Sequence, residues 1–219
     1  AIASFPLSTS AAEPPRIASL GSNMDKNAYL AILSETLSRI AEGDFYQANV
    51  TRKFFGTFSE APDDFSLYQR LIEASPAPYS AFLRLNGASL LSSSPELFLK
   101  IEHGQIATRP IKGTAPREQS GEALAKSKKD QAENLMIVDL MRHDLARVCT
   151  PGSVEVKELF ATDSFSTLHH LSSVIEGRLQ PGRTPLDALK AAFPPGSMTG
   201  APKIAAMKFL AGKEVLDRG

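Results

Sequence analysis

The sequence has little of what marks a secreted, membrane-spanning or nucleic-acid-binding protein. Its one cysteine, Cys149, cannot form an internal disulfide, so a reducing compartment such as the cytoplasm is the expected location and a buried thiol the expected role. No apolar run reaches the ~18 residues that a membrane span needs, and no signal-peptide pattern opens the chain. Acidic and basic residues balance at 24 each, so no net charge favours nucleic acid or an anionic membrane surface.

What is present is a composition typical of a folded domain. The chain has 219 residues, of which 42% are hydrophobic and 22% are charged, and this is enough to bury one large core. We therefore expect one domain that binds a small molecule. The first residue is alanine rather than methionine, which leaves room for an upstream portion with a targeting peptide and makes a plastid the second candidate location.

The pattern of apolar residues predicts an α+β fold. Residues 1–23 are rich in Ala, Ser and Pro and are typical of a linker, so the predicted domain spans residues 24–219. Helices are expected between Asp25 and Gly43, from near Asp63 or Asp64 to about Ser75, over about 120–148, from Thr184 and from Pro202. Strands are expected over 44–58, 153–160 and 169–179. Helices and strands mix without a βαβ rhythm, which indicates antiparallel sheets.

Helical periodicity also predicts an apolar face on each of three helices. In the first helix it consists of Tyr29, Leu33, Leu37 and Ile40, and in the third of Leu135, Val138 and Met141. In the second helix Phe65, Tyr68, Leu71 and Ile72 are expected to be buried.

Two short turns predict an antiparallel meander over residues 79–112. Asn86-Gly87 and His103-Gly104 each separate two strand-like stretches, and Asn-Gly is the strongest short hairpin signal. A hairpin closed at 103–104 places Glu96 and Lys112 at the ends of adjacent strands, where they can approach each other. Lys112 itself lies on a strand that is expected to end in a turn.

Lys112 and Glu96 are the first candidates for chemistry. A lysine nucleophile must be neutral and needs a desolvated site, and the neighbouring Ile111 and Gly113 allow a close, dry approach by a ligand. A nearby carboxylate can exchange a proton with the group that leaves. By spacing alone the alternatives are a solvated or ion-paired Lys112 and a Glu96 that follows Pro95 in a turn.

Three further features have both a functional and a structural interpretation. Glu133 opens a predicted helix, where it can bind a hard cation such as Mg²⁺. The structural alternative is that its negative charge only interacts favourably with the helix dipole. His170 alternates with Ser172 on a strand and can act as an acid, a base or a hydrogen-bond donor. The alternative is a structural histidine whose hydrogen bonds are all made within the protein. The loop FPPGSMTGAPK precedes the helix expected from Pro202, whose free amides can bind a carboxylate or phosphate.

Five motifs in a fixed order resemble those of a known family. They read SSSPELF, TRPIKGTAPR, AENLMIVDLMRHD, HHLSSVIEG and AAFPPGSMTGAPK, and the upstream GDFYQANVTRKF fits as well. Over about residues 25–219 the chain resembles the chorismate-utilising enzymes, the family of anthranilate synthase component I, isochorismate synthase and aminodeoxychorismate synthase component I. In this family the residue between PI and GT separates subgroups, because alanine is typical of anthranilate synthases and lysine of aminodeoxychorismate synthases.

The resemblance implies a reaction and roles for the candidate residues. Lys112 attacks C2 of chorismate while the C4 hydroxyl leaves, with Glu96 as general acid and base. His170 lies beside the ring, and Glu133 is a Mg²⁺ ligand. Ammonia then adds at C4 and displaces Lys112, which gives 4-amino-4-deoxychorismate, the precursor of 4-aminobenzoate for folate. The substrate carboxylates are held by Gly113, Thr114, Gly196, Ser197 and Thr199.

The resemblance also implies a fold and a partner. The family fold is two antiparallel sheets packed as a sandwich with outer helices, and the family's chain continues past Arg218 with further Mg²⁺-binding glutamates, so we expect a partial domain. Ammonia comes from glutamine through an amidotransferase that is a separate subunit or is fused upstream. His143 and Ala146 depart from the family's asparagine and glycine without touching a proposed catalytic group. Two alternatives stay open: anthranilate synthase component I, and a non-catalytic piece that binds the amidotransferase.

Overall fold

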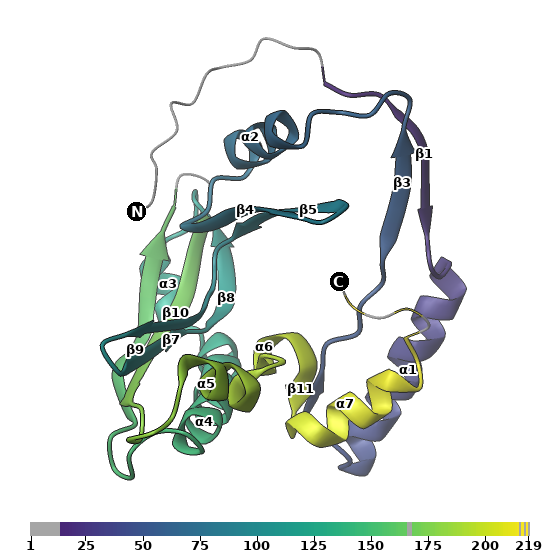
Figure 1. The fold of residues 1–219 in the computed structure, drawn as a ribbon. Coiled ribbons are helices and arrows are strands. Elements are labelled where there is room, and N and C mark those ends of the chain that lie inside the picture. Colours follow the sequence, from purple (N-terminus) through teal and green to yellow (C-terminus); the bar gives the residue numbers. More distant parts are fainter. Residues whose placement is uncertain (1–13, 166–167, 215, 217, 219) are drawn as a thin grey trace. The chain divides into compact units, whose positions relative to one another are not determined.

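The computed structural model describes residues 14–165, 168–214, 216 and 218 (Figure 1). Its contacts divide the chain into two compact units, residues 1–23 with 53–96 and residues 24–52 with 97–219. Each unit is made of two separate stretches of sequence, which alternate along the chain.

The described residues of the first unit form two antiparallel strand pairs and one helix. Its elements are β1 (Ile17–Ser22), β3 (Phe54–Phe58), α2 (Asp64–Ala74), β4 (Tyr79–Leu85) and β5 (Ala88–Ser94). β1 pairs with β3, and β4 pairs with β5. The prediction that residues 1–23 are all linker was wrong, because residues 17–22 form the strand β1. This strand leaves no local signal in the sequence, since its partner β3 is distant along the chain. Residues 1–13 of that segment lie outside the described residues.

Local signals account for the helix and the hairpin of this unit. The helix α2 begins at Asp64, as predicted, and Asp63 caps it by accepting a hydrogen bond of 2.8 Å from the backbone amide three residues on. The turn at Asn86-Gly87 is also confirmed, with Gly87 at a φ of 79°. α2 packs on the hairpin through Phe65 and Tyr68, whose ring centroids lie 5.4 and 5.6 Å from that of Phe82.

The second unit is built around a five-stranded antiparallel sheet. Its strands are β6 (Leu97–Glu102), β7 (Gln105–Arg109), β8 (Ile111–Pro116), β9 (Glu155–Ser164) and β10 (Leu168–Arg178). β10 pairs with β9, and it also pairs first with β8 and then with β7. Because β7 and β8 pair with successive parts of β10, they form one line that is interrupted at Pro110.

The meander predicted over residues 79–112 is two separate sheets. The predicted turn at His103-Gly104 does join β6 to β7, but β4 and β5 form a two-stranded sheet of their own in the other unit. The prediction was wrong at Pro95 and Glu96, between β5 and β6, where proline interrupts the ladder because it lacks an amide donor.

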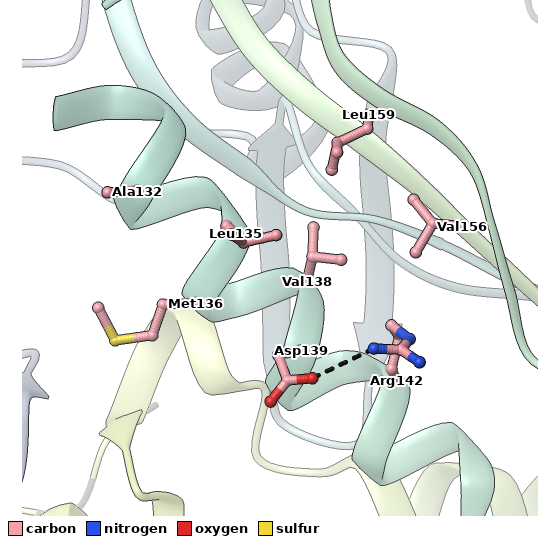
Figure 2. A pocket seen from close by; sticks show the side chains of 8 residues that line it. All are labelled: Ala132, Leu135, Met136, Val138, Asp139, Arg142, Val156 and Leu159. Atoms are coloured by element: carbon pink, nitrogen blue, oxygen red, sulfur yellow. Dashed lines mark hydrogen bonds and ion pairs between the residues drawn. The ribbon is translucent and has the colours of Figure 1, made fainter. Parts of the chain in front are cut away.

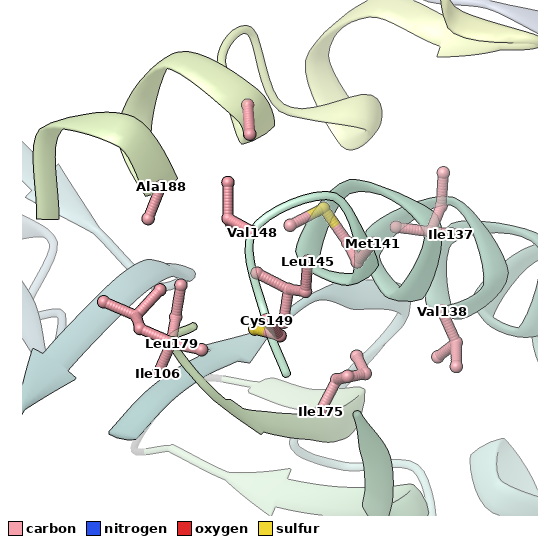
Figure 3. Packing of buried hydrophobic residues seen from close by; sticks show 11 residues of the cluster. Ile106, Ile137, Val138, Met141, Leu145, Val148, Cys149, Ile175, Leu179 and Ala188 are labelled. Atoms are coloured by element: carbon pink, nitrogen blue, oxygen red, sulfur yellow. The ribbon is translucent and has the colours of Figure 1, made fainter. Parts of the chain in front are cut away.

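Helices cover one face of the five-stranded sheet. They are α3 (Gly121–Lys126) and α4 (Lys128–Ala146), and α5 (Pro185–Ala192) packs beside α4. The single helix expected over 120–148 is divided at Ser127, which has a ψ of 110° and caps α4. Side chains from α4, α5, the sheet and the segments that follow α4 and β10 form the core in Figure 3, namely Ile106, Ile137, Val138, Met141, Leu145, Val148, Cys149, Ile175, Leu179, Ala188 and Ala191.

The remaining elements of this unit connect its first stretch of sequence, residues 24–52, to the C-terminal part of its second stretch. They are α1 (Lys26–Glu42), β2 (Gln47–Ala48), α6 (Gly196–Thr199), β11 (Gly200–Ala201) and α7 (Lys203–Ala211). β2 pairs with β11, and the ring of Phe45 lies 5.2 Å from that of Phe209. Asp25 caps α1 and Gly43 ends it at a φ of 88°, both as predicted. The strand expected over 44–58 consists instead of β2 and β3, because the amides of Asn49 and Thr51 bond to Thr199 and Glu214.

The buried stripes were predicted less well than the helices themselves. Leu37 is 67% exposed, and the buried residue of α1 is the adjacent Thr36. In α2 the buried residue is Gln69, while the predicted stripe is half-buried. In α4 Leu135 is exposed. Periodicity finds a face to within about one position, and packing between distant segments decides what covers it.

The predicted α+β class with antiparallel sheets is confirmed, since every strand pair in the described part of the chain is antiparallel. The packing of two sheets into a sandwich stays a prediction. Within the same residues, no helix is both long enough and apolar enough for a membrane crossing.

Candidate active site

Lys112 and Gly113 lie at a β-bulge, where β8 pairs with β10. The register shifts by one residue between His170 and Ser172, so that Lys112 and Gly113 together oppose the single residue Leu171. Gly113 has a φ of 91°, which is the left-handed conformation that glycine adopts without strain. The strand continues past Gly113 to Pro116 and then ends in a turn, as predicted, with the amide of Gln119 donating to the carbonyl of Pro116 at 3.0 Å. Bulges redirect a side chain and occur next to active sites, so this interruption fits a functional lysine.

Gly113 is also fixed by its contact with α4. A Cβ atom added to Gly113 would lie 2.9 Å from Cβ of Asp130, so a side chain here is both strained and crowded. We predict that Gly113→Ala destabilises the protein by at least about 1 kcal/mol more than Gly104→Ala. Gly104 is the matched control, because its φ is 78° and no atom lies within 4 Å of an added Cβ. Urea unfolding of the two variants measures the difference, and equal losses would contradict the crowding.

Lys112 is half-buried, and its side-chain nitrogen has no hydrogen-bond or ion-pair partner among the residues that the structure describes. This disfavours, within those residues, the alternative in which Lys112 is half of an ion pair. The amine is therefore available to a ligand, as a nucleophile requires.

Thr114 and His170 face each other across β8 and β10. Oγ1 of Thr114 lies 2.9 Å from Nδ1 of His170, and the ring of Phe165 lies edge-on to the imidazole at 5.6 Å. Burial lowers the pKa of His170, while a hydrogen bond with the backbone of Gly113 and the charge of Asp163 act in the opposite direction. A buried imidazole of this kind is neutral near pH 7 and can accept or donate one hydrogen bond.

A network around Arg109, which sequence reasoning missed, lies on the same face of the sheet. Nε and Nη2 of Arg109 bond to the two carboxylate oxygens of Asp163 at 3.1 and 2.6 Å. The hydroxyl of Ser172 donates to Asp163 at 2.6 Å and accepts from Nε of Arg109 at 3.1 Å. The only signals in the sequence are that Arg109 lies three residues before Lys112 and Ser172 two residues after His170.

Glu133 lies in the second turn of α4, so the prediction that it opens the helix was wrong. The first-turn carboxylate is Asp130, and the helix-dipole alternative therefore applies to that residue rather than to Glu133. The carboxylate of Glu133 forms an ion pair with Lys129 at 4.0 Å on the exposed side. The described residues contain no group of three or more His, Cys, Asp or Glu that could hold a metal. They supply one carboxylate at this place, and a Mg²⁺ site needs further oxygen ligands.

A buried asparagine next to Glu133 fixes the rotation of α4 on the sheet. Oδ1 of Asn134 accepts from the hydroxyl of Ser173 at 2.5 Å, and its Nδ2 donates to the carbonyl of Leu171 at 3.4 Å. Ser173 in turn accepts from the amide of Phe160, which has a φ of 59°. Asn134 is fully buried, so losing either partner would leave a buried polar group unsatisfied. This network holds Glu133 in a fixed direction relative to β10.

The glycines of the GSMTG loop have structural reasons that the prediction did not include. A Cβ on Gly196 would lie 2.2 Å from Leu140 of α4, and one on Gly200 would lie 2.2 Å from the carbonyl of Gln47. The loop forms α6 instead of open coil, and its Ser197 and Thr199 are buried. Binding of a substrate carboxylate by Gly196, Ser197 and Thr199 stays a prediction.

The helix after this loop begins with a buried ion pair that sequence reasoning also missed. Lys203 of α7 bonds to the buried carboxylate of Asp144 on α4 and, at 3.0 Å, to the carbonyl of Ala192. Burial raises the pKa of Asp144, and the bond and charge of Lys203 oppose that effect. The pair fastens the start of α7 and the end of α5 to the helix that carries Glu133.

Glu96 belongs to the first unit, whereas Lys112 belongs to the second. Its amide donates to the hydroxyl of Ser94 at 3.3 Å, and its carbonyl accepts from the same hydroxyl at 3.2 Å. The β6–β7 pairing ends with Leu97 opposite Arg109, so Lys112 lies beyond it. The approach of Glu96 to Lys112 stays a prediction.

An apolar groove between α4 and β9 is separate from these residues (Figure 2). Leu135 and Val138 line it from the helix and Leu159 from the strand, and Asp139 pairs with Arg142 at 3.3 Å beside them. None of the predicted site residues lines this groove.

The match to a family model decides which group of proteins this is. The model of the chorismate binding enzyme family matches residues 6–219. The chain belongs to this family. The resemblance in the five motifs is thereby confirmed for the chorismate-binding enzymes as a group.

Two of the curated relatives have names that are more specific than the family description. The chain is 46% identical over 196 residues to aminodeoxychorismate synthase component 1 of Salmonella typhimurium, covering 86% of this chain and 43% of that protein. It is 42% identical over 204 residues to the chloroplastic aminodeoxychorismate synthase of Arabidopsis thaliana, covering 89% of this chain and 22% of that protein. The chain thus spans less than half the length of these relatives.

Two solved structures share the fold. Anthranilate synthase component I from Streptococcus pneumoniae superposes with a TM-score of 0.83 at 29% identity, over 94% of this chain and 46% of that one. The menaquinone-specific isochorismate synthase MenF from Escherichia coli gives a TM-score of 0.78 at 19% identity, over 97% of this chain and 51% of that one. These matches confirm the predicted fold relationship to anthranilate synthase component I.

Proposed function

We propose that this chain is part of an aminodeoxychorismate synthase component I, which converts chorismate and ammonia to 4-amino-4-deoxychorismate. The observation that carries the proposal is Lys112, a half-buried lysine at a β-bulge whose amine has no partner among the described residues. The names of the relatives at 42–46% identity support it. The product serves the synthesis of 4-aminobenzoate and folate.

The proposed reaction consists of two displacements at the substrate ring. The neutral amine of Lys112 forms a bond to C2, the ring double bonds shift, and the C4–O bond breaks. Glu96 donates a proton to the departing oxygen, which leaves as water. Ammonia then forms a bond to C4, the double bonds shift back, and the bond from C2 to Lys112 breaks. Two successive displacements place the new nitrogen where the hydroxyl was, and a covalent lysine permits this whereas an alanine does not.

The neighbouring groups orient the substrate in this proposal. His170, neutral because it is buried and held at Nδ1 by Thr114, presents its other ring nitrogen beside the ring. The backbone at the Gly113 bulge and the α6 residues Ser197 and Thr199 hold the carboxylates. Mg²⁺ bound at Glu133 would neutralise a substrate carboxylate. Its other ligands would have to come from outside the described residues, since Glu133 alone is not a complete site.

Ammonia is proposed to come from a glutamine amidotransferase, as a separate subunit or a fused domain. The designation of the Salmonella typhimurium relative as component 1 supports a two-component system. The cytoplasm is the proposed location, with a plastid as the alternative that the chloroplastic relative suggests.

Anthranilate synthase component I is the second candidate, and the TM-score of 0.83 to such an enzyme favours it. Product identification separates the two. The intact protein is incubated with chorismate, Mg²⁺ and an ammonium salt, and the products are resolved by liquid chromatography. We expect 4-amino-4-deoxychorismate. Formation of 2-aminobenzoate would favour the second candidate, and consumption of no chorismate would favour a non-catalytic role.

Replacing Glu133 tests the proposed metal ligand. A hard cation needs the charge that Glu133→Gln removes, so we expect the Mg²⁺ concentration for half-maximal activity to rise about tenfold or more in the intact protein. Asp139→Asn is the matched control, because Asp139 is an exposed carboxylate on the same helix. An unchanged Mg²⁺ titration for Glu133→Gln would exclude the ligand role.

A further inference from the structure

The three side chains Arg109, Asp163 and Ser172 form a closed network on the face of the sheet that carries His170. Each of the three bonds to the other two, with distances between 2.6 and 3.1 Å. Ser172 is fully buried, and the side chains of Arg109 and Asp163 are 30% and 26% exposed. A bidentate arginine pair with low exposure is both stronger and more rigid than an ion pair on the surface.

The network lies directly beside His170. Asp163 is the residue opposite His170 in the pairing of β9 with β10. Ser172 lies two residues after His170, so the two side chains are on the same face of β10. His169 lies on the other face, where it contacts Ser164 and Arg117.

Few charged groups in the described part of the chain adjoin His170. β9 contributes Asp163 and the more distant Glu158, which lies 3.5 Å from Arg109. β7 contributes Arg109, and β8 contributes Lys112 at the bulge next to the uncharged Thr114. Arg109 therefore places its positive charge against the one carboxylate that directly faces the histidine.

We propose that Arg109, Asp163 and Ser172 are positioning residues for His170, holding its strand against β7 and β9 and balancing the charge beside its ring. Arg109 also fixes the end of β7, three residues before Lys112, so one network supports both groups that the proposed reaction places at the ring. The catalytic part of this inference rests on the proposed function, whereas the effect of the network on His170 does not.

The inference predicts opposite effects of two substitutions that break the same ion pair. Arg109→Met leaves Asp163 as an uncompensated negative charge, which favours the imidazolium form and raises the pKa of His170. Asp163→Asn removes that negative charge and leaves Arg109 uncompensated, which lowers the pKa of His170. A network with only a structural role predicts shifts in the same direction, or none, because both variants lose the same bonds.

Histidine NMR on the intact protein measures this without any substrate. The His170 signal is assigned with His170→Gln and followed through a pH titration in both variants. Lys157→Met is the matched control, since Lys157 is a β9 cation paired with Glu155 on the exposed side. Arg109→Lys and Ser172→Ala extend the test if Arg109→Met does not fold. Arg109→Lys should shift the pKa of His170 less than Asp163→Asn does. Opposite shifts with an unmoved control support the inference, and parallel or absent shifts overturn it.

Activity separates a failure of this inference from a failure of the proposed function. With chorismate and ammonium as substrates, Arg109→Met should lower kcat about tenfold or more with little change in KM, because misplaced groups act mainly on the chemical step. The acidic limb of its pH profile should move up, and that of Asp163→Asn down. If the pKa shifts of His170 appear in the NMR titration but the wild-type protein does not aminate chorismate, the proposed function is wrong. The inference that the network positions His170 still holds in that case.

Discussion

Substituting Lys112 should have the largest effect on activity of any change in this chain. Lys112→Arg is expected to lose about a thousandfold or more in kcat with chorismate and ammonium, because a guanidinium stays protonated and bulky and can neither attack the ring nor make room. Lys112→Ala is expected to retain some activity, with the product shifted toward 2-aminobenzoate, because ammonia can enter the space that the side chain leaves.

The order of these two variants distinguishes a nucleophile from a charge. A lysine that only binds an anion or an ion-pair partner tolerates arginine better than alanine. Lys100→Arg and Lys100→Ala are matched controls, since Lys100 lies on β6 of the same sheet and pairs with Glu102 on the surface. Full activity of Lys112→Arg would contradict the covalent mechanism.

Glu96→Gln should give the second-largest effect. A general acid contributes mainly in the transition state and is typically worth 10²–10⁴-fold, so we expect kcat to fall by about that factor while KM changes little. Steady-state kinetics of the intact protein measure both constants. Glu102→Gln, which removes an exposed carboxylate of β6, is the control and should leave both unchanged. A higher KM at constant kcat would assign Glu96 to binding instead of proton transfer.

Features that depend on neighbouring residues could be predicted from the sequence. The cap at Asp25, the stop at Gly43, the helix start near Asp63 and the turns at 86–87 and 103–104 all appear where expected, because each depends on the conformational preference of one or two residues. The motifs also identified the family, which the family model confirms.

Features that depend on pairing between distant segments could not be predicted from the sequence. β1 has no partner until β3, and among the described residues the β4–β5 hairpin joins no other strand. The bulge at Lys112 exists only because β8 continues β7 along β10 with one extra residue. Likewise Arg109, Asp163 and Ser172 come from three strands, so their spacing in the sequence gives no indication that they meet.

The candidate site was predictable in its residue types more than in its geometry. Lys112, Thr114 and His170 were selected from motifs, and the structure brings Thr114 and His170 into contact. The structural reason why glycine is needed at positions 196 and 200 was missed. Their close packing against Leu140 and against β2 depends on the tertiary structure and not on the local sequence.

The covalent role of Lys112 can be tested directly by mass spectrometry. The intact protein is incubated with chorismate and Mg²⁺ but without an ammonia source, so that the second displacement has no external amine. We predict an adduct in the intact-protein spectrum, equal in mass to chorismate less one water, that peptide mapping places on the peptide containing PIKGT and that is absent from Lys112→Ala and Lys112→Arg. A protein that aminates chorismate once ammonium is added, yet shows no adduct on Lys112 before that addition, would contradict the mechanism.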